Sequence, residues 1–357
     1  MQTWLNRVWY GGGRAPGWLL PVTMLYQWAV AARRFLYEKK IFRSLRVACP
    51  VIVVGNLTVG GTGKTPLVCW LVQRLLEHGY RPGVVTRGYG GSSGLRLIQA
   101  SDSAKLVGDE PLLIMRRTAV PVAVGRDRPA AAQLLIQAGC NVIVSDDGLQ
   151  HYALARDAEI AVVDGTRGLG NGRLLPAGPL REPLQRLAGV DVVVINGGGI
   201  APRSGQVPAA VPPEASALAE FAGPMVPMGV AAALAINLRD SSKTPLPSFA
   251  GKDVHALAGI GHPERFFNLL RGFGLSLIVH PFNDHAALQA SDLAFADDLP
   301  VLMTEKDAVK CSTFAQVNHW YVPIEAQFDA VGSNILMTCV LDKIKSRQCI
   351  SERGKNG

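Results

Sequence analysis

The amino-acid sequence predicts an α/β protein: a mostly parallel sheet with helices on both faces, followed by a second, smaller α/β domain. Short runs rich in valine and isoleucine alternate with longer segments that repeat apolar residues at helical spacing, which is typical of buried parallel strands joined by helices. One such run leads directly into the glycine-rich segment VGGTGKT at residues 59–65. After a stretch rich in Pro and Ala at residues 201–227, strand–turn–helix units begin again, which indicates the second domain.

The composition limits the kind of protein. The chain has 357 residues, enough for two domains, and a formal net charge of +8. Its six cysteines are scattered without metal-binding spacing, which indicates reduced thiols in the cytoplasm. The positive charge fits a generic basic surface, and it also fits a protein that meets anionic lipid or a phosphorylated substrate. We find no nucleic-acid-binding module in the sequence, expect no nucleic acid partner, and predict no protein partner.

The N-terminal region combines an uncharged aromatic segment with a basic one. No charged residue lies between Arg14 and Arg33, and this interval contains Trp18, Tyr26 and Trp28. A basic cluster follows, at Arg33, Arg34, Lys39, Lys40, Arg43 and Arg46. We expect a helix over about residues 22–38 that lies in the membrane interface, with its basic residues facing anionic lipid. The alternatives are a secretory signal peptide, a spanning helix, and packing onto the protein's own core.

The segment VIVVGNLTVGGTGKT, residues 51–65, has the order of a phosphate-binding loop. A buried strand leads into a glycine loop, and an amphipathic helical pattern follows it. The glycines are Gly60, Gly61 and Gly63. Such a loop curls its backbone N–H groups round phosphate oxygens, and the helix dipole adds to the attraction. Lys64 is expected to reach the β- and γ-phosphates of ATP and Thr65 to bind Mg²⁺, so the predicted sheet is P-loop NTPase-like.

The spacing of this loop departs from the usual pattern at one position. The pattern G-x-x-x-x-G-K-[ST] requires a glycine where Thr58 stands. A glycine-rich turn that holds no nucleotide is the alternative. Because Gly-Lys-Thr lies between a strand and a helix, we expect a nucleoside triphosphate site.

Charged residues follow the next strand of the predicted sheet. A strand at residues 83–86 ends in TRGYGG, which places Arg87 at the edge where parallel sheets bind ligands; a solvated loop arginine is equally compatible. The motif VGDEP at residues 107–111 places Asp109 and Glu110 just before an apolar helix. Local chemistry alone favours a helix-capping role for these two acids.

Paired acids end a later strand. A strand at residues 120–124 runs into GRDR at residues 125–128, and a helix follows. The segment NVIVSDDGLQH, residues 141–151, then takes four apolar or β-branched positions straight into Asp146 and Asp147. In phosphate-loop ATPases, carboxylates at such a strand tip hold Mg²⁺ directly or through water. A strand-ending Asp-Gly turn would have the same sequence. The combination of the paired acids with the Gly-Lys-Thr loop favours metal binding.

A long Gly/Pro loop separates two further strands. The strands are expected at residues 160–163 and 192–195, and the loop is LGNGRLLPAGPLREP, residues 169–183. A loop of this length is usually functional or disordered. Its charged residues are Arg173, Arg181 and Glu182.

The last third of the chain predicts the smaller domain. Residues 254–274 predict a strand, a Gly-Ile-Gly turn and a helix. They are followed by a strand, the segment HPFNDH at 280–285, a helix, and a strand that runs into TEKDAVK at 304–310. We expect the histidines and TEKD to face the strand tips of the first domain. The predicted divisions are an N-terminal region with the interfacial helix at 1–48, a P-loop core domain at 49–225, a smaller α/β domain at 226–345, and a tail at 346–357.

Together these motifs resemble one family. They are NLTVGGTGKTP, TRGYGG, GDEP, SDDGLQH, LLPAGPLREP, the F-x-DH of Phe282 to His285, and TEKDAVK. Nearly the whole chain resembles the tetraacyldisaccharide 4'-kinases, the lipid A 4'-kinases of Gram-negative bacteria, whose loop likewise lacks the first glycine. The resemblance implies transfer of the γ-phosphate of ATP to the 4'-hydroxyl of an acylated glucosamine disaccharide 1-phosphate. It further implies a peripheral, monotopic enzyme at the cytoplasmic face of the inner membrane.

The resemblance also implies roles for individual residues. Asp109 matches the catalytic base and His285 its partner, so the resemblance replaces the capping role with a catalytic one. The nucleotide-binding positions are Gly60, Gly61, Thr62, Gly63, Lys64 and Thr65, with Lys64 also catalytic. The metal-associated positions are Thr65, Glu110, Asp146 and Asp147. The other active-site candidates are Arg87, Arg128, His151, Arg181 and Glu182, with Arg128 favoured over Arg126.

Two other functions compete with this prediction. A kinase of a small soluble metabolite has the same loop and acids, but it gives no reason for a basic, Trp-rich N-terminal helix. A regulatory ATPase or GTPase switch needs a purine-selective motif, and the sequence contains no Asn-Lys-x-Asp guanine signature. The dependence of ATP turnover on an acylated acceptor distinguishes these functions.

Overall fold

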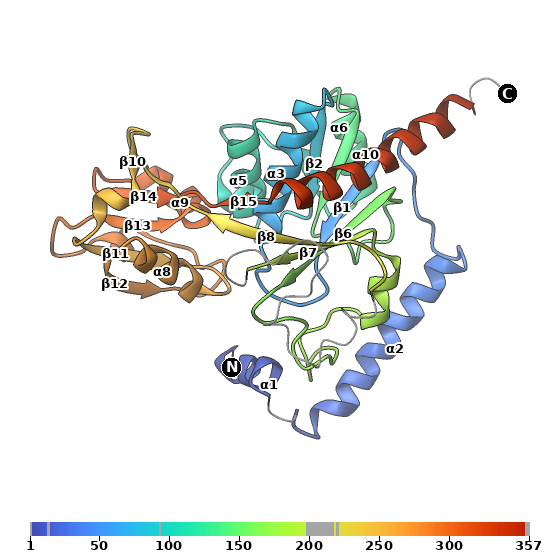
Figure 1. Ribbon diagram of the computed structural model, residues 1–357, viewed down its shortest axis with the longest axis horizontal. Helices are drawn as coiled ribbons and strands as arrows, with labels where there is room; N and C mark the ends of the chain where they lie inside the picture. Colours follow the sequence, from blue (N-terminus) through green and yellow to red (C-terminus); the bar gives the residue numbers. More distant parts are fainter. Residues whose placement is uncertain (1, 13–14, 93, 198–217, 219–220, 354–357) are drawn as a thin grey trace.

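The structure, a computed structural model, describes residues 2–12, 15–92, 94–197, 218 and 221–353. It contains two units, each built on its own sheet (Figure 1). We call the nine-stranded sheet with its helices the first unit and the six-stranded sheet with its helices the second unit.

The first unit has the predicted, mostly parallel sheet. Its strand order is β15-β8-β7-β6-β1-β5-β2-β4-β3. The strands are β1 (Val51–Gly55), β2 (Pro82–Thr86), β3 (Arg96–Leu97), β4 (Val122–Val124), β5 (Val142–Asp146), β6 (Ala158–Asp164), β7 (Val192–Asn196), β8 (Met225–Ala231) and β15 (Glu325–Gln327). Only the edge pairs β3/β4 and β15/β8 are antiparallel among the described strands of this sheet. The parallel strand pairing is confirmed.

Helices cover both faces of this sheet, as predicted. Ile52 and Val54 of β1 pack into the core beneath α3 (Lys64–Glu77), α5 (Asp109–Thr118) and α10 (Ala330–Arg353). Val51 and Val53 face the opposite side, which α6 (Arg128–Gln137) and the 3₁₀ helix η1 (Leu184–Gly189) cover. The short helix α4 (Ala104–Val107) precedes α5. Because both faces of β1 are buried, its sequence is a continuous apolar run instead of an alternating one.

The second unit is a smaller mixed sheet in the order β10-β9-β14-β13-β11-β12. Its strands are β9 (Leu234–Asn237), β10 (Lys243–Pro245), β11 (Asp253–Ala258), β12 (Ser276–Pro281), β13 (Val301–Thr304) and β14 (His319–Val322). Its helices are α8 (Pro263–Gly272), α9 (Glu305–Cys311) and the 3₁₀ turns η3 (Leu246–Phe249), η4 (Ala290–Leu293) and η5 (Ser312–Phe314). The helix predicted between residues 285 and 300 is wrong, because only η4 forms there.

The chain crosses between the units twice, which corrects the predicted domain limits. β8 begins at Met225 and pairs with β7, so the first unit continues past residue 225. β15 returns to pair with β8, and α10 runs to Arg353 instead of ending in a tail at 346. Sequence periodicity identifies such strands but not their partners, which lie far away along the chain. Most of the Pro/Ala-rich stretch lies outside the described residues, namely its residues 201–217 and 219–220.

Two helices form the N-terminal region, α1 (Gln2–Tyr10) and α2 (Leu19–Glu38). The predicted helix is α2, which begins three residues earlier than expected. It buries Leu19 and Thr23 against the first unit and exposes Leu25 and Trp28 by 69% and 72%. Among the described residues, no helix combines the length and apolar character needed to span a membrane.

The packing of α10 predicts a matched pair of stability effects. Val340 is fully buried in the core of the first unit, whereas Val331 on the same helix is 58% exposed. We expect Val340→Ala to lower the free energy of unfolding by about 2 kcal/mol through lost burial and a residual cavity. Val331→Ala should change it by less than about 0.5 kcal/mol. Urea denaturation measures both; equal effects would contradict the placement of α10 in this core.

Candidate active site

The phosphate loop lies between β1 and α3 and is braced by β7. Gly63 has a φ of +92°, and a Cβ there would lie 2.1 Å from Asn196 Nδ2, so only glycine fits. Asn196 Nδ2 donates to the Thr62 carbonyl oxygen at 2.8 Å. Asn196 was not among the residues predicted from the sequence, although its place at the carboxyl end of a parallel strand was a usable signal.

Lys64 is the first residue of α3, and its ammonium group is held at the strand tips. Its Nζ donates to Asn56 Oδ1 at 3.1 Å and lies 3.5 Å from Asp147 Oδ1. Asn56, a second residue not predicted from the sequence, also donates to the Gly60 carbonyl oxygen at 3.3 Å. The lysine is therefore positioned by oxygen atoms, the kind of group that a phosphate presents.

Thr58 occupies the position of the missing glycine because the loop pairs with another segment there. Thr58 is buried and forms an antiparallel bridge with Leu180 of the Gly/Pro loop. On either side, Val59 N donates to the Pro179 carbonyl oxygen at 2.8 Å and Arg181 N donates to that of Leu57 at 2.6 Å. An extended residue suits this pairing, so the departure from the usual spacing has a structural reason.

The two acids at the tip of β5 lie beside the phosphate loop, as predicted. β1 and β5 pair in parallel, with Val54 opposite Asp146. Asp146 is buried, its Oδ1 has no hydrogen-bond partner among the described residues, and burial with the charges of Glu110 and Asp147 raises its pKa to about 7. Asp147 is opposite in character: burial acts to raise its pKa, but the charges of Lys64 and Arg181 hold that pKa well below its usual range.

Arg181 supplies the main cation for Asp147. Its Nη1 lies 2.9 Å from each carboxylate oxygen of Asp147. Glu182 is buried behind it, where its carboxylate accepts hydrogen bonds from the Tyr152 hydroxyl and from Gln150 Nε2. Of the two predicted residues, Arg181 reaches the acids, and Glu182 belongs to a buried supporting network.

Of the two arginines of GRDR, one is buried and the other is exposed. Arg128 is buried, and its guanidinium donates to Ser145 Oγ at 2.7 Å and to the Asp147 carbonyl oxygen at 3.1 Å. Burial lowers the pKa of Arg128 to about 10. Arg126 is exposed, and its carbonyl oxygen lies 3.1 Å from His151 Nε2. Arg128 therefore supports the strand tip from beneath, while Arg126 and the exposed Arg87 lie at its rim.

Asp109 and His285 meet where the two units touch. His285 Nδ1 lies 3.1 and 3.2 Å from the two carboxylate oxygens of Asp109. Burial acts to raise the pKa of Asp109, but the hydrogen bond from His285 and the charge of Lys306 outweigh it and lower that pKa. The same hydrogen bond raises the pKa of His285. Asp109 also accepts a hydrogen bond from the backbone N–H of Glu110 at 2.9 Å, but it is the first residue of α5 and the N-cap is Gly108.

Two lysines of TEKDAVK join this pair and were not predicted individually. Lys306 Nζ donates to Glu110 Oε1 at 3.0 Å and to Asp284 Oδ1 at 2.9 Å, and lies 3.3 Å from His285 Nε2. Lys310 Nζ lies 3.7 Å from Asp109 Oδ2. The expectation that TEKD faces the first domain is confirmed. Lys306 and His285 thus carry the second unit's contribution to the site.

The predicted metal positions are only partly assembled. Within the described residues, no group of three or more His, Cys, Asp or Glu side chains is arranged to hold a metal ion. Glu110 is engaged by Lys306 and Asp147 by Arg181, which leaves Asp146. Its unpartnered buried oxygen suits a cation, and Mg²⁺ in nucleotide sites needs only one or two protein oxygens besides phosphate and water. The residues therefore fit a nucleotide-bound Mg²⁺ better than a free one.

Fold and site together define a P-loop phosphotransferase: a lysine-bearing phosphate loop, acids on the adjacent strand tip, and a carboxylate–histidine pair facing them from the unit boundary. Comparison with known proteins gives the family. A model of the LpxK family, described as tetraacyldisaccharide-1-P 4'-kinase, matches residues 16–344. The chain belongs to this family.

Individual relatives agree with this assignment. The chain is 48% identical over 334 residues to the tetraacyldisaccharide 4'-kinase of Nitrosococcus oceani, and the match covers 92% of each chain. It is 51% identical over 321 residues to that of Alkalilimnicola ehrlichii, covering 88% of this chain and 90% of the relative. A crystal structure of LpxK from Aquifex aeolicus in complex with ATP matches with a TM-score of 0.73 at 27% identity, covering 91% of this chain and 98% of that chain.

The buried arginine predicts a stability effect that separates it from its neighbour. Arg128→Met removes the donor to Ser145 and Asp147 and leaves buried acids less compensated, so we expect a loss of about 3 kcal/mol in the free energy of unfolding. Arg126→Met, at an exposed side chain, should change it by less than about 0.5 kcal/mol. Urea denaturation of both variants checks this. An Arg128→Met protein as stable as the wild type would mean that Arg128 does not support the strand tip.

Proposed function

We propose that the chain is an ATP-dependent kinase that transfers the γ-phosphate to the 4'-hydroxyl of a tetraacyldisaccharide 1-phosphate, a lipid A precursor. The observation that carries the mechanism is the contact between Asp109 and His285 at the unit boundary. The names of the relatives support the acceptor, and the ATP complex of the solved LpxK supports the donor.

The phosphate loop binds and orients the triphosphate. The backbone N–H groups of Gly60, Gly61, Thr62 and Gly63 and the N-terminus of α3 face the phosphate oxygens. Lys64 leaves Asn56 and neutralises charge on the transferring phosphoryl group, where such a cation contributes several kcal/mol of transition-state stabilisation. Arg181 keeps Asp147 in place beside it.

In this proposal Mg²⁺ binds together with the nucleotide. Asp146 and Thr65 would hold the ion. Glu110 and Asp147 would join them once Lys306 and Arg181 release these carboxylates. When bound, the ion would neutralise negative charge on the phosphates. The raised pKa of Asp146 reflects burial among like charges, which a cation would relieve.

Asp109 acts as the general base in this proposal. The 4'-oxygen forms a bond to the γ-phosphorus, the bond from that phosphorus to the bridging β–γ oxygen breaks, ADP leaves, and the hydroxyl proton moves to Asp109. His285 orients the carboxylate through Nδ1 and shares the proton afterwards. Since His285 comes from the second unit, the pair requires both units in contact.

A double-mutant cycle tests this pair. We expect Asp109→Asn to lower kcat by at least about 10³-fold while the affinity for Mg-ATP stays within a few-fold, because the base acts on the acceptor. His285→Ala should lower kcat less, and the double variant should be hardly slower than Asp109→Asn, since residues that act as a unit are non-additive. Steady-state kinetics with acylated disaccharide phosphate measures all three variants. Losses that multiply, or a loss confined to Mg-ATP binding, would exclude Asp109 as the base.

The outward face of α2 supports attachment to the cytoplasmic face of the inner membrane. Its exposed large side chains recur at helical spacing. They are Val22, Met24, Leu25, Trp28 and Phe35, with Trp18 directly before the helix. The basic cluster lies at the end of this face, and each Lys or Arg near an anionic surface contributes about 1 kcal/mol. A peripheral, monotopic attachment brings the site to a lipid acceptor.

The charge contribution can be tested separately. Changing Arg33, Arg34, Lys39 and Lys40 to Gln should shift the protein from sedimented anionic vesicles to the supernatant and weaken the salt dependence of what remains bound. The matched control changes four exposed basic residues of the second unit to Gln: Arg239, Lys243, Lys252 and Arg271. Equal losses in both proteins would show a general charge effect, and no loss in the first would leave apolar insertion as the attachment.

A further inference from the structure

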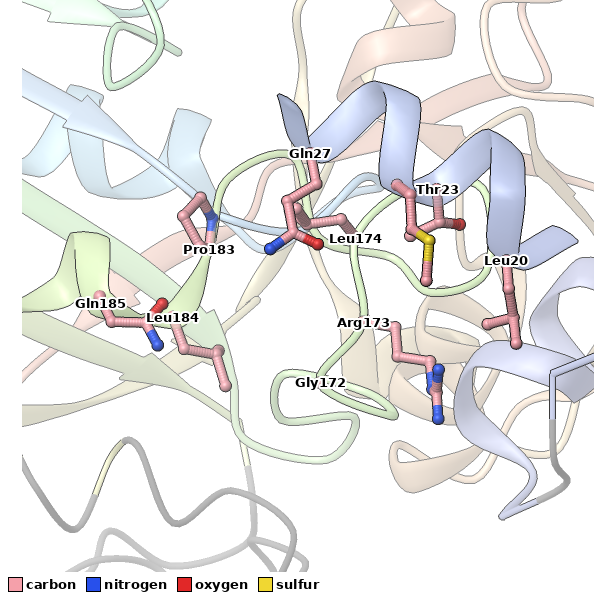
Figure 2. A pocket seen from close by; sticks show the side chains of 10 residues that line it. Leu20, Thr23, Gln27, Gly172, Arg173, Leu174, Pro183, Leu184 and Gln185 are labelled. Atoms are coloured by element: carbon pink, nitrogen blue, oxygen red, sulfur yellow. The ribbon is translucent and has the colours of Figure 1, made fainter. Parts of the chain in front are cut away.

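The inner face of α2 lies against the Gly/Pro loop that carries Arg181. Figure 2 shows α2 above this loop, with Thr23 and Gln27 on the helix and Leu174 and Pro183 on the loop. A groove of about 300 Å³ remains between them. The helix therefore contacts the same segment that reaches the acids at the tip of β5.

Hydrogen bonds, in addition to apolar contacts, join α2 to the loop. The Tyr26 hydroxyl donates to the Arg181 carbonyl oxygen at 3.0 Å. Thr23 Oγ1, which is buried, accepts from Ala177 N at 3.1 Å. Burial raises the pKa of Tyr26, so its hydroxyl remains a donor at neutral pH. Opposite faces of one helix thus carry the exposed apolar side chains and the bonds to the loop.

The backbone of Arg181 is held from two sides. Its N–H donates to the Leu57 carbonyl oxygen at 2.6 Å, at the start of the phosphate loop, while its carbonyl accepts from Tyr26. Its side chain then reaches both oxygens of Asp147 at 2.9 Å, and Lys64 lies 3.5 Å from the same carboxylate. A shift of α2 would move one of the two backbone anchors of Arg181.

We infer that Tyr26 is a positioning residue: it transmits the seating of α2 to Arg181 and thereby sets the geometry of the phosphate site. The inference rests on the role proposed above for Arg181. It links the attachment of the helix to the rate of phosphoryl transfer, so a correctly seated α2 is needed for full turnover as well as for binding to the lipid surface.

The test removes single hydroxyl groups. Tyr26→Phe should lower kcat about five-fold, the effect of one lost neutral hydrogen bond, with KM for Mg-ATP and vesicle sedimentation unchanged. Tyr37→Phe is the matched control, because the Tyr37 hydroxyl, also on α2, has no hydrogen-bond partner among the described residues, and it should leave kcat unchanged. Assays use the full chain with ATP and detergent-dispersed acylated disaccharide 1-phosphate.

A cycle with Arg181 distinguishes positioning from general destabilisation. In an Arg181→Met background, Tyr26→Phe should have no further effect on kcat; Arg181→Lys replaces this background if Arg181→Met fails to fold. An equal five-fold loss in both backgrounds, a loss in Tyr37→Phe, or a wild-type rate in Tyr26→Phe would overturn the inference. If Arg181→Met itself keeps the wild-type kcat, the proposed role of Arg181 fails independently.

Discussion

The compensation of clustered, partly buried negative charge determines how this site is built. Four carboxylates converge at one edge of the first sheet: Asp109, Glu110, Asp146 and Asp147. Negative charges that lie close together inside a protein repel each other strongly unless cations lie beside them. The compensating groups are Lys64, Arg128, Arg181, Lys306 and Lys310. No single element supplies enough of them, so the site requires α3, α6, the Gly/Pro loop and the second unit together.

This constraint explains why distant parts of the chain are joined at one place. Arg181 must be held close to Asp147, and the pairing of its loop with Thr58 and with α2 does so. Lys306 must reach Glu110, which brings α9 against α5 and places His285 beside Asp109. Backbone strain marks the same positions: Asp147 and His285 have φ values of +49° and +60°, which few non-glycine residues adopt. Asp146 keeps one carboxylate oxygen without a hydrogen-bond partner among the described residues.

The sequence predicted what depends on local order and failed where long-range pairing decides. The phosphate loop and Asp146–Asp147 were identified because parallel strands present their carboxyl ends at one edge. Local chemistry alone predicted that Asp109 caps a helix, and only the family resemblance predicted that it is the catalytic base. Its partner His285 lies 176 residues away along the chain, so no local pattern indicates the pair. The edge strand β15 and its neighbour β8 were misplaced for the same reason, and Lys306 was predicted only as part of TEKD. Nothing in the spacing of residues near Thr58 indicates that Leu180 pairs with it.

We propose that both units meet to transfer phosphate to a lipid acceptor. The most direct measurement follows γ-labelled ATP with the full chain, with and without acylated disaccharide 1-phosphate. The account predicts label on the acceptor in equal amount to the ADP formed, and little ADP without acceptor. ADP formed at the same rate without acceptor, with the label in inorganic phosphate, would contradict it and indicate an ATPase.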